Sequence, residues 1–289
     1  MISNVVYVLG AGFSAPLNIP VMSNFIEKAK NLYENDTSKY KHIKQVLDKI
    51  RSRLAYVALY YNSNLDNIEE VLSILETERY VGKAPETDLN NYIKFIVDVI
   101  RYYTPALNGF SKYERISKGS YKVRRERQQA SQPFETESSV INSIFSVKDN
   151  SISDVIQTYG MFVIGLFNAN IKVKNPQSSD SLQFDEFVIN SDIDNTSEIK
   201  YSVITLNYDL VLENLAEHIS SIISGDEMKF NQSGDGVALQ SPSLVKLHGS
   251  IENNNIILPT WNKNINKNSK EWEKALWWTL RTGHYFNGS

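Results

Sequence analysis

The stretch Val5-Val6-Tyr7-Val8-Leu9-Gly10-Ala11-Gly12-Phe13-Ser14 organises the rest of the chain. Its first half is an unbroken apolar run, which is typical of a strand buried on both faces of a parallel sheet. Gly10 and Gly12 let the backbone turn tightly and approach a phosphate, and a helix expected at about 22–33 offers N–H groups to that anion. Because Ala15 replaces the third glycine of G-x-G-x-x-G, a strand ending in an ordinary glycine turn is an equally good interpretation.

Composition excludes several classes of protein. The chain has 289 residues, 42% of them hydrophobic, which is enough to build one large or two ordinary domains. A net charge of −3 provides no global field to attract nucleic acid or an anionic membrane. There are no cysteines, which excludes cysteine-ligated zinc, and the four histidines are scattered, so we expect no metal site. No run approaches the ~20 apolar residues of a membrane span, and we expect a cytoplasmic protein.

The region from about 40 to 170 is predicted to be a large helical insertion. Apolar residues recur at intervals of three and four over 42–58, Asp66-Asn67-Ile68-Glu69 reads as a capping box, and a third helix follows Asp88. A strongly apolar helix is expected at 152–168. Between 111 and 139 the periodicity fails and basic residues gather, which we interpret as a solvated loop, with a docking surface as the alternative. Polar segments at 174–181 and 190–197 are predicted to be surface connections.

Sheet-like patterning returns after residue 200. Strands are expected at 201–206, 244–247 and 256–258, with helices at 210–220 and 269–281. The sequence therefore predicts an α/β fold, with a Rossmann-like parallel sheet, helices on both faces and the large helical insertion.

Three of the predicted strands end in polar tips, namely Gly10-Ala11-Gly12, Asn207-Tyr208-Asp209 and His248-Gly249. The carboxyl ends of parallel strands form the ligand-binding edge of an open sheet, so distant tips can converge on one crevice. Each tip also has a structural explanation. Asn207 and Asp209 can cap the following helix, and His248 can be a hydrogen-bonded core histidine.

Together, the three tips resemble the sirtuin-like superfamily of NAD-consuming proteins. Its motifs occur in order: Gly10-Ala11-Gly12-Phe13-Ser14 is similar to the G-A-G-x-S turn, Asn18-Ile19-Pro20 to the G-I-P loop, Thr205-Leu206-Asn207-Tyr208-Asp209 to T-x-N-x-D, and Lys246-Leu247-His248-Gly249 to the H-G pair. The Asn-Tyr-Asp and Leu-His-Gly-Ser forms, with Asp66-Asn67-Ile68-Glu69, resemble the prokaryotic branch of NAD-hydrolysing anti-phage effectors (NADases) more closely.

This resemblance implies a single NAD-binding domain over 1–289 that hydrolyses NAD to nicotinamide and ADP-ribose during abortive infection. Asn207 would position the ribose hydroxyls and the attacking water, and His248 would accept a proton. NAD would be the substrate, with no further cofactor and no zinc. The nucleotide-binding residues implied are Gly10, Ala11, Gly12, Phe13, Ser14, Pro20, Thr205, Asp209 and Gly249.

The chain also departs from the superfamily's pattern. Deacylase sirtuins carry a four-cysteine zinc module that is absent here, so peptide deacylation is not expected. Val21-Met22-Ser23 stands in place of Asp-Phe-Arg, and Leu206 in place of a glutamine. The superfamily usually adds one more strand and a Gly-x-Ser turn after a helix like 269–281. We therefore expect either a truncated piece or a tail that has left the family pattern.

Two other functions stay open. One is a non-catalytic module that binds NAD or ADP-ribose, and the other is an ADP-ribosyltransferase that docks its acceptor on the basic stretch 112–127. A dehydrogenase is disfavoured, because no acidic residue ends a second strand about twenty positions beyond Gly12. By family analogy the expected partners are NAD and either further copies of the chain or a defence subunit such as an ATPase or an Argonaute-like protein, without direct nucleic-acid or membrane binding.

Overall fold

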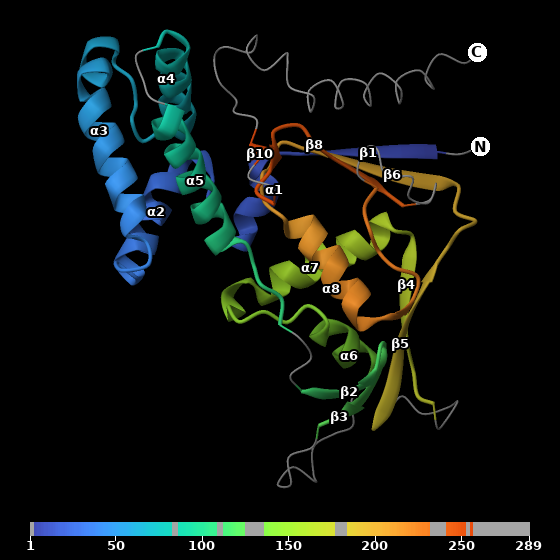
Figure 1. Cartoon of the computed structure of the whole chain (residues 1–289). Coiled ribbons are helices and arrows are strands. Elements are labelled where there is room, and N and C mark those ends of the chain that lie inside the picture. Colours follow the sequence, from blue (N-terminus) through green and yellow to red (C-terminus); the bar gives the residue numbers. More distant parts are fainter. Residues whose placement is uncertain are drawn as a thin grey trace, which may run out of the picture. The chain divides into compact units, whose positions relative to one another are not determined.

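β1 (Ser3–Leu9) and the elements after it are described by a computed structural model over residues 3–82, 86–108, 112–124, 136–176, 184–231, 241–252 and 255–256 (Figure 1). The chain divides into two compact units. Unit 1 comprises Met1–Val8, Pro105–Ile204 and Val211–Val245, and unit 2 comprises Leu9–Thr104, Thr205–Leu210 and Lys246–Ser289. The single-domain arrangement stays a prediction, and each unit is described by itself.

A small parallel sheet orders its strands β1-β6-β8, where β6 is Ile199–Thr205 and β8 is Ser243–Lys246. All three strands were expected, but burial of β1 on both faces is wrong. Val6 and Val8 are 49% and 72% exposed, whereas Tyr7 packs edge-on against Phe162 with ring centroids 5.2 Å apart. Side chains alternate along a strand, so only one face of β1 is covered. The structure is a mixed α/β one, and the Rossmann-like arrangement with helices on both faces stays a prediction.

A second, curled sheet in unit 1 was not predicted. Its strands are β2 (Tyr113–Ser117), β3 (Ser120–Val123), β5 (Glu186–Ile193) and β4 (Ala169–Lys174), all antiparallel, with the short β7 (Ser224–Gly225) parallel to β5. The loop expected at 111–139 and the connection expected at 190–197 are therefore wrong where β2, β3 and β5 lie. Gly119 forms the β2–β3 turn at φ 77°, and a Cβ there would overlap Ser224.

The helices of unit 1 are α6 (Glu137–Ser143), α7 (Ser153–Leu166) and α8 (Val211–Ile222), preceded at α7 by the 3-10 turn η3 (Asn150–Ile152). The helices expected at 152–168 and 210–220 are thus confirmed, and α7 packs against α8 (Figure 1). Strands β2 to β4 interrupt the region 40–170, so it is not helical throughout.

Unit 2 begins with α1 (Ala11–Ser14) and the 3-10 turns η1 (Ala15–Leu17) and η2 (Met22–Asn24). Pro16 lies inside η1, because proline is tolerated in the first turn of a helix. Four longer helices follow as predicted: α2 (Phe25–Asn35), α3 (Lys41–Tyr61), α4 (Ile68–Tyr80) and α5 (Glu86–Tyr103). Their core includes Leu32, Ile43, Leu54, Leu75 and Phe95.

The predicted capping box of α4 is displaced by one residue. Asn67, not Asp66, is the N-cap, and its side chain accepts hydrogen bonds from the backbone N–H groups of Glu69 and Glu70 at 3.0 and 3.3 Å. Glu70 reaches back to the side chain of Asn67 at 3.4 Å. The carboxylate of Glu69 therefore takes no part in capping α4.

The end of the chain is only partly described. β9 (Gly249–Ser250) pairs antiparallel with β10 (Asn255–Ile256), whereas 257–258 and the helix expected at 269–281 lie outside the described residues. None of the helices in the described ranges is long and apolar enough to cross a membrane.

Two glycines of α7 give a matched test of packing in unit 1. A methyl group at Gly160 would overlap the buried ring of Phe145, whereas nothing lies within 4 Å of one at Gly165. We expect Gly160→Ala to lower the free energy of unfolding by about 1–3 kcal/mol, since overpacking forces neighbours apart. Gly165→Ala should leave it equal or raise it by up to about 1 kcal/mol. Urea unfolding measures both, and equal effects of the two changes would contradict this packing.

Candidate functional site

Main-chain hydrogen bonds in unit 2 bring the three polar tips together. The N–H of Leu206 donates to the carbonyl of Leu9 at 3.1 Å, and the N–H of Leu247 donates to the carbonyl of Thr205 at 2.9 Å. The tip after β6 therefore lies between the tips after β1 and β8. Segments nearly 200 positions apart form one edge, and all of its residues belong to unit 2.

Buried side chains tie this edge together. The hydroxyl of Ser14 donates to Oδ2 of Asp209 at 2.6 Å, and the oxygen of that hydroxyl accepts from Nδ2 of Asn207 at 2.9 Å. Nδ2 of Asn207 also donates to the carbonyl of Gly10 at 3.0 Å. Ser14, Asn207 and Asp209 are each less than a tenth exposed, so these bonds are shielded from competing water.

The amide group of Asn207 is thereby fixed in one orientation. Both of its N–H bonds are used, while Oδ1 accepts no hydrogen bond from the described residues. The hydroxyl of Thr205 accepts from the backbone N–H of Asn207 at 3.0 Å and holds the main chain of the tip. A fixed, unoccupied carbonyl oxygen is suited to accept a hydrogen bond from a ligand hydroxyl or a water molecule.

A pocket of about 240 Å³ opens beside this network. Its wall is largely apolar, and its polar groups come from the tips and from the start of α4. All of the lining residues belong to unit 2. They are Ala11, Ser14, Ile19, Pro20, Val21, Met22, Phe25, Ile68, Glu69, Ile100, Leu206, Asn207, Tyr208, Asp209 and His248.

His248 and Tyr208 form the aromatic part of the lining. Their ring centroids are 5.9 Å apart with the planes tilted by 33°. Burial lowers the pKa of His248 from its ordinary value, because the charged imidazolium loses water. Burial, with the nearby charge of Glu69, raises the pKa of Tyr208. At neutral pH the pocket therefore presents a neutral imidazole beside a protonated phenol.

The His248 tip is braced from two sides. The ammonium group of Lys246 donates to the main-chain carbonyl of Asp209 and, at 3.5 Å, to the hydroxyl of Ser250. The N–H of Ile251 donates to the carbonyl of Tyr208 at 3.0 Å, and Arg101 of α5 donates to the carbonyl of Ile251 at 2.9 Å. These bonds hold the main chain on both sides of His248, whose side chain lines the same pocket as Asn207.

The remaining predicted site residues contribute less directly. Gly10, Gly12, Phe13, Thr205 and Gly249 do not line the pocket. Neither Gly10 nor Gly12 adopts a positive φ, and the chain passes directly from β1 into α1 through Gly10, the N-cap of α1. Among the described residues, apart from the chain neighbours and the local helix backbone, no heavy atom lies within 4 Å of a Cβ placed at either one, which leaves open space beside the backbone. Gly249 has φ 80° and turns the chain from the His248 tip into β9.

Sequence reasoning missed Glu69, Tyr208 and Lys246 as parts of this site. Tyr208 and Lys246 stand inside the quoted motifs, so their position gave a signal. Glu69 was taken for a capping residue, and only the shift of the N-cap to Asn67 shows that its carboxylate is available. Within the described ranges, no group of three or more His, Asp or Glu residues is arranged to hold a metal ion.

Comparison with known families places part of this site in a known class. Residues 201–279 match the model of a family described as a SIR2-like domain. The match includes the Asn207 and His248 tips, while the Gly10–Ser14 stretch lies outside it. No curated protein matches the chain. The sirtuin-like resemblance is thus supported for residues 201–279, without a branch being specified.

The environment of His248 predicts its titration. We expect its midpoint below the ordinary value of about 6.5, since burial favours the neutral ring. Proton NMR of the imidazole signals across pH 4–9 measures it, and His248→Ala assigns the signal. A midpoint at or above about 6.5 would show that the ring is better hydrated, or closer to an anion, than the pocket indicates.

Proposed function

We propose that this chain is an NAD glycohydrolase, which cleaves NAD to nicotinamide and ADP-ribose. The observation that carries the proposal is the pairing of Asn207 and His248 in one pocket. The amide of Asn207 is locked with Oδ1 available, and His248 is held beside it as a neutral base. The SIR2-like match over 201–279 supports an NAD-related activity for these residues.

The chemistry needs a shielded site and a base. When the bond between C1′ of the ribose and the nicotinamide nitrogen breaks, the electron pair leaves with nicotinamide and C1′ becomes an oxocarbenium-like cation. Water then attacks C1′ and gives up a proton. The products are nicotinamide, ADP-ribose and one proton, so no oxidant or reductant is consumed.

Asn207 and His248 divide this work. Oδ1 of Asn207 accepts a hydrogen bond from a ribose hydroxyl or from the attacking water and thereby orients it. His248 accepts the proton, and its lowered pKa keeps it in the basic form at neutral pH. Asp209 acts indirectly. Its Oδ2 accepts a hydrogen bond from Ser14, which in turn binds the amide of Asn207.

The size of the pocket suits one end of the substrate. A volume of about 240 Å³ is below the range of roughly 300–1,000 Å³ for drug-sized ligands. It therefore fits the nicotinamide-ribose end of a dinucleotide, with the rest of the molecule outside. The open space beside Gly10 and Gly12, at the start of α1, is where we place the pyrophosphate. NAD is the substrate here, and the absence of cysteines supports a site without zinc.

The biological setting follows from the resemblance. The Asn-Tyr-Asp and Leu-His-Gly-Ser forms support the prokaryotic anti-phage branch, in which loss of NAD ends an infection together with the cell. Such an activity must be held in check, so we propose control by self-association or by a partner subunit, such as an ATPase or an Argonaute-like protein.

Nicotinamide release tests the proposal. We expect the wild-type chain to release nicotinamide from NAD, and Asn207→Ala and His248→Ala each to reduce the rate at least about a hundredfold, as for loss of a positioned base or orienting group. Lys44→Ala is the control, because within the part of the chain that the structure describes Lys44 pairs only with Asp48 of α3, and both side chains are exposed. Chromatography of the products distinguishes ADP-ribose from a cyclic product.

Two results would contradict hydrolysis. One is a folded wild-type chain that binds NAD without releasing nicotinamide, alone or in its native assembly, and this would identify a nucleotide-binding module. The other is transfer of labelled ADP-ribose to protein or nucleic acid, which would identify a transferase.

A further inference from the structure

The ionisable side chains that line the pocket or lie beside it differ in whether they are charged and in whether they have hydrogen-bond or ion-pair partners. Oδ2 of Asp209 accepts from Ser14, and the ammonium group of Lys246 binds the main chain of the same residue. Tyr208 and His248 are neutral at pH 7 because burial shifts their pKa values in opposite directions. The carboxylate of Glu69, by contrast, has no hydrogen bond or ion pair within the described ranges. Glu69, an exposed residue, thus provides the pocket with a carboxylate that no described side chain pairs.

Glu69 is also held in place. It stands in the first turn of α4, where Asn67 binds its backbone N–H. Two ion pairs join α4 and its N-cap region to α3, namely Asp66 with Arg51 and Glu78 with Arg53. The helix is therefore fixed near both of its ends.

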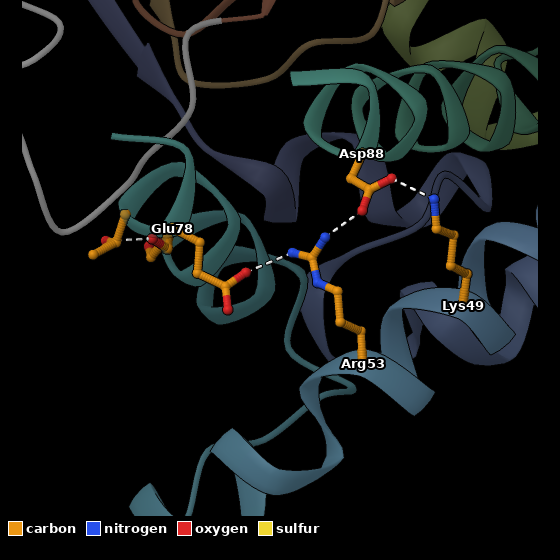
Figure 2. Close-up of polar contacts among 6 residues, drawn as sticks. Lys49, Arg53, Glu78 and Asp88 are labelled. Carbon is orange, nitrogen blue, oxygen red and sulfur yellow. Dashed lines mark hydrogen bonds and ion pairs between the residues drawn. The ribbon is translucent and has the colours of Figure 1, made fainter. Parts of the chain in front are cut away.

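The second of these ion pairs extends into a charge cluster around the buried side chain of Asp88 (Figure 2). Arg53 lies between Glu78 of α4, at 2.5 Å, and Asp88 of α5, while Lys49 donates to Asp88 at 2.6 Å. The side chain of Asp88 is only 2% exposed. Because a buried carboxylate is stable only when it is paired, this cluster links α3, α4 and α5. Glu69 thus lies in the first turn of a helix that ion pairs hold against its neighbours.

We propose that Glu69 is a specificity-determining residue that makes the pocket select a positively charged aromatic ring. The inference rests on the proposed function and concerns its substrate: the nicotinamide ring is cationic in NAD, whereas the reduced ring of NADH and free nicotinamide are neutral. Ile19, Phe25 and Ile100 give the same pocket an apolar wall, and an apolar surround strengthens the attraction between the carboxylate and a cationic ring.

The charge of Glu69 also fits the course of the reaction. Cleavage moves the positive charge from the ring to the ribose, so a nearby carboxylate attracts the substrate and stabilises the developing cation. The departing nicotinamide is neutral and is no longer held by this charge. Glu69 therefore favours oxidised substrate over reduced substrate and promotes release of the first product.

A pair of small probes tests this charge selection without any cleavage. 1-Methylnicotinamide carries the cationic ring and nicotinamide the neutral one, and neither has a glycosidic bond. We expect the wild-type chain to bind the cation at least about fivefold more tightly, as for one partly exposed charge pair. Glu69→Gln should reduce the preference to below about twofold. Ligand-observed NMR titration measures both affinities.

Glu70→Gln is the matched control. It removes the same charge one position along, but the carboxylate of Glu70 accepts from the backbone of Asn64 at 2.7 Å and does not line the pocket. This variant should keep the wild-type preference. The inference is overturned if Glu69→Gln retains the preference, if Glu70→Gln loses it equally, or if the wild-type chain shows none.

Nicotinamide release from NAD, measured on the same samples, separates the two proposals. Release by the wild-type chain with an unchanged probe preference in Glu69→Gln refutes the role of Glu69 and leaves hydrolysis standing. A preference that depends on Glu69, without any release, supports charge selection and refutes hydrolysis.

Discussion

A chain of buried hydrogen bonds runs from the carbonyl of Gly10 through the amide of Asn207 and the hydroxyl of Ser14 to the carboxylate of Asp209. It joins the tip that follows β1 to the tip that follows β6. Each polar group in this series of hydrogen bonds needs its partner, because leaving one buried polar group unpaired would lower the free energy of unfolding by about 1–3 kcal/mol. The same network that joins these tips therefore also orients Oδ1 of Asn207 as an acceptor for a ligand.

The other wall of the pocket depends on helices rather than on strand ends. Ile68 and Glu69 enter the lining from α4, and the ion pairs of Arg51 and Arg53 hold that helix against α3. Helical side chains placed in this way sit on a rigid support, which a binding site requires if its charges are to act on a defined part of the ligand. The strand tips and the first turn of α4 thus contribute different chemical groups. The tips supply the amide of Asn207 and the imidazole of His248, and α4 supplies the carboxylate of Glu69.

Features set by local sequence were predicted well, and features set by tertiary contacts were not. The apolar periodicity predicted α3, α4, α5, α7 and α8, and the strand-end argument predicted that the tips at Gly10–Gly12, Asn207 and His248 share one edge. The curled sheet was missed, since β2 and β3 alternate charged residues with Tyr113 and Tyr121, whose burial arises only from packing on Phe187. Glu69 was missed because it was assigned to a capping box begun by Asp66, whereas Asn67 is the N-cap and Asp66 pairs with Arg51.

The most direct test of the central claim is a crystal structure of the His248→Ala variant with NAD, since loss of the base should preserve the substrate. The account predicts that the nicotinamide-ribose end occupies the pocket, with a ribose hydroxyl or a bound water within hydrogen-bonding distance of Oδ1 of Asn207 and the ring beside Glu69. NAD bound with its nicotinamide outside this pocket, or with the Asn207 amide turned away from the ribose, would contradict it.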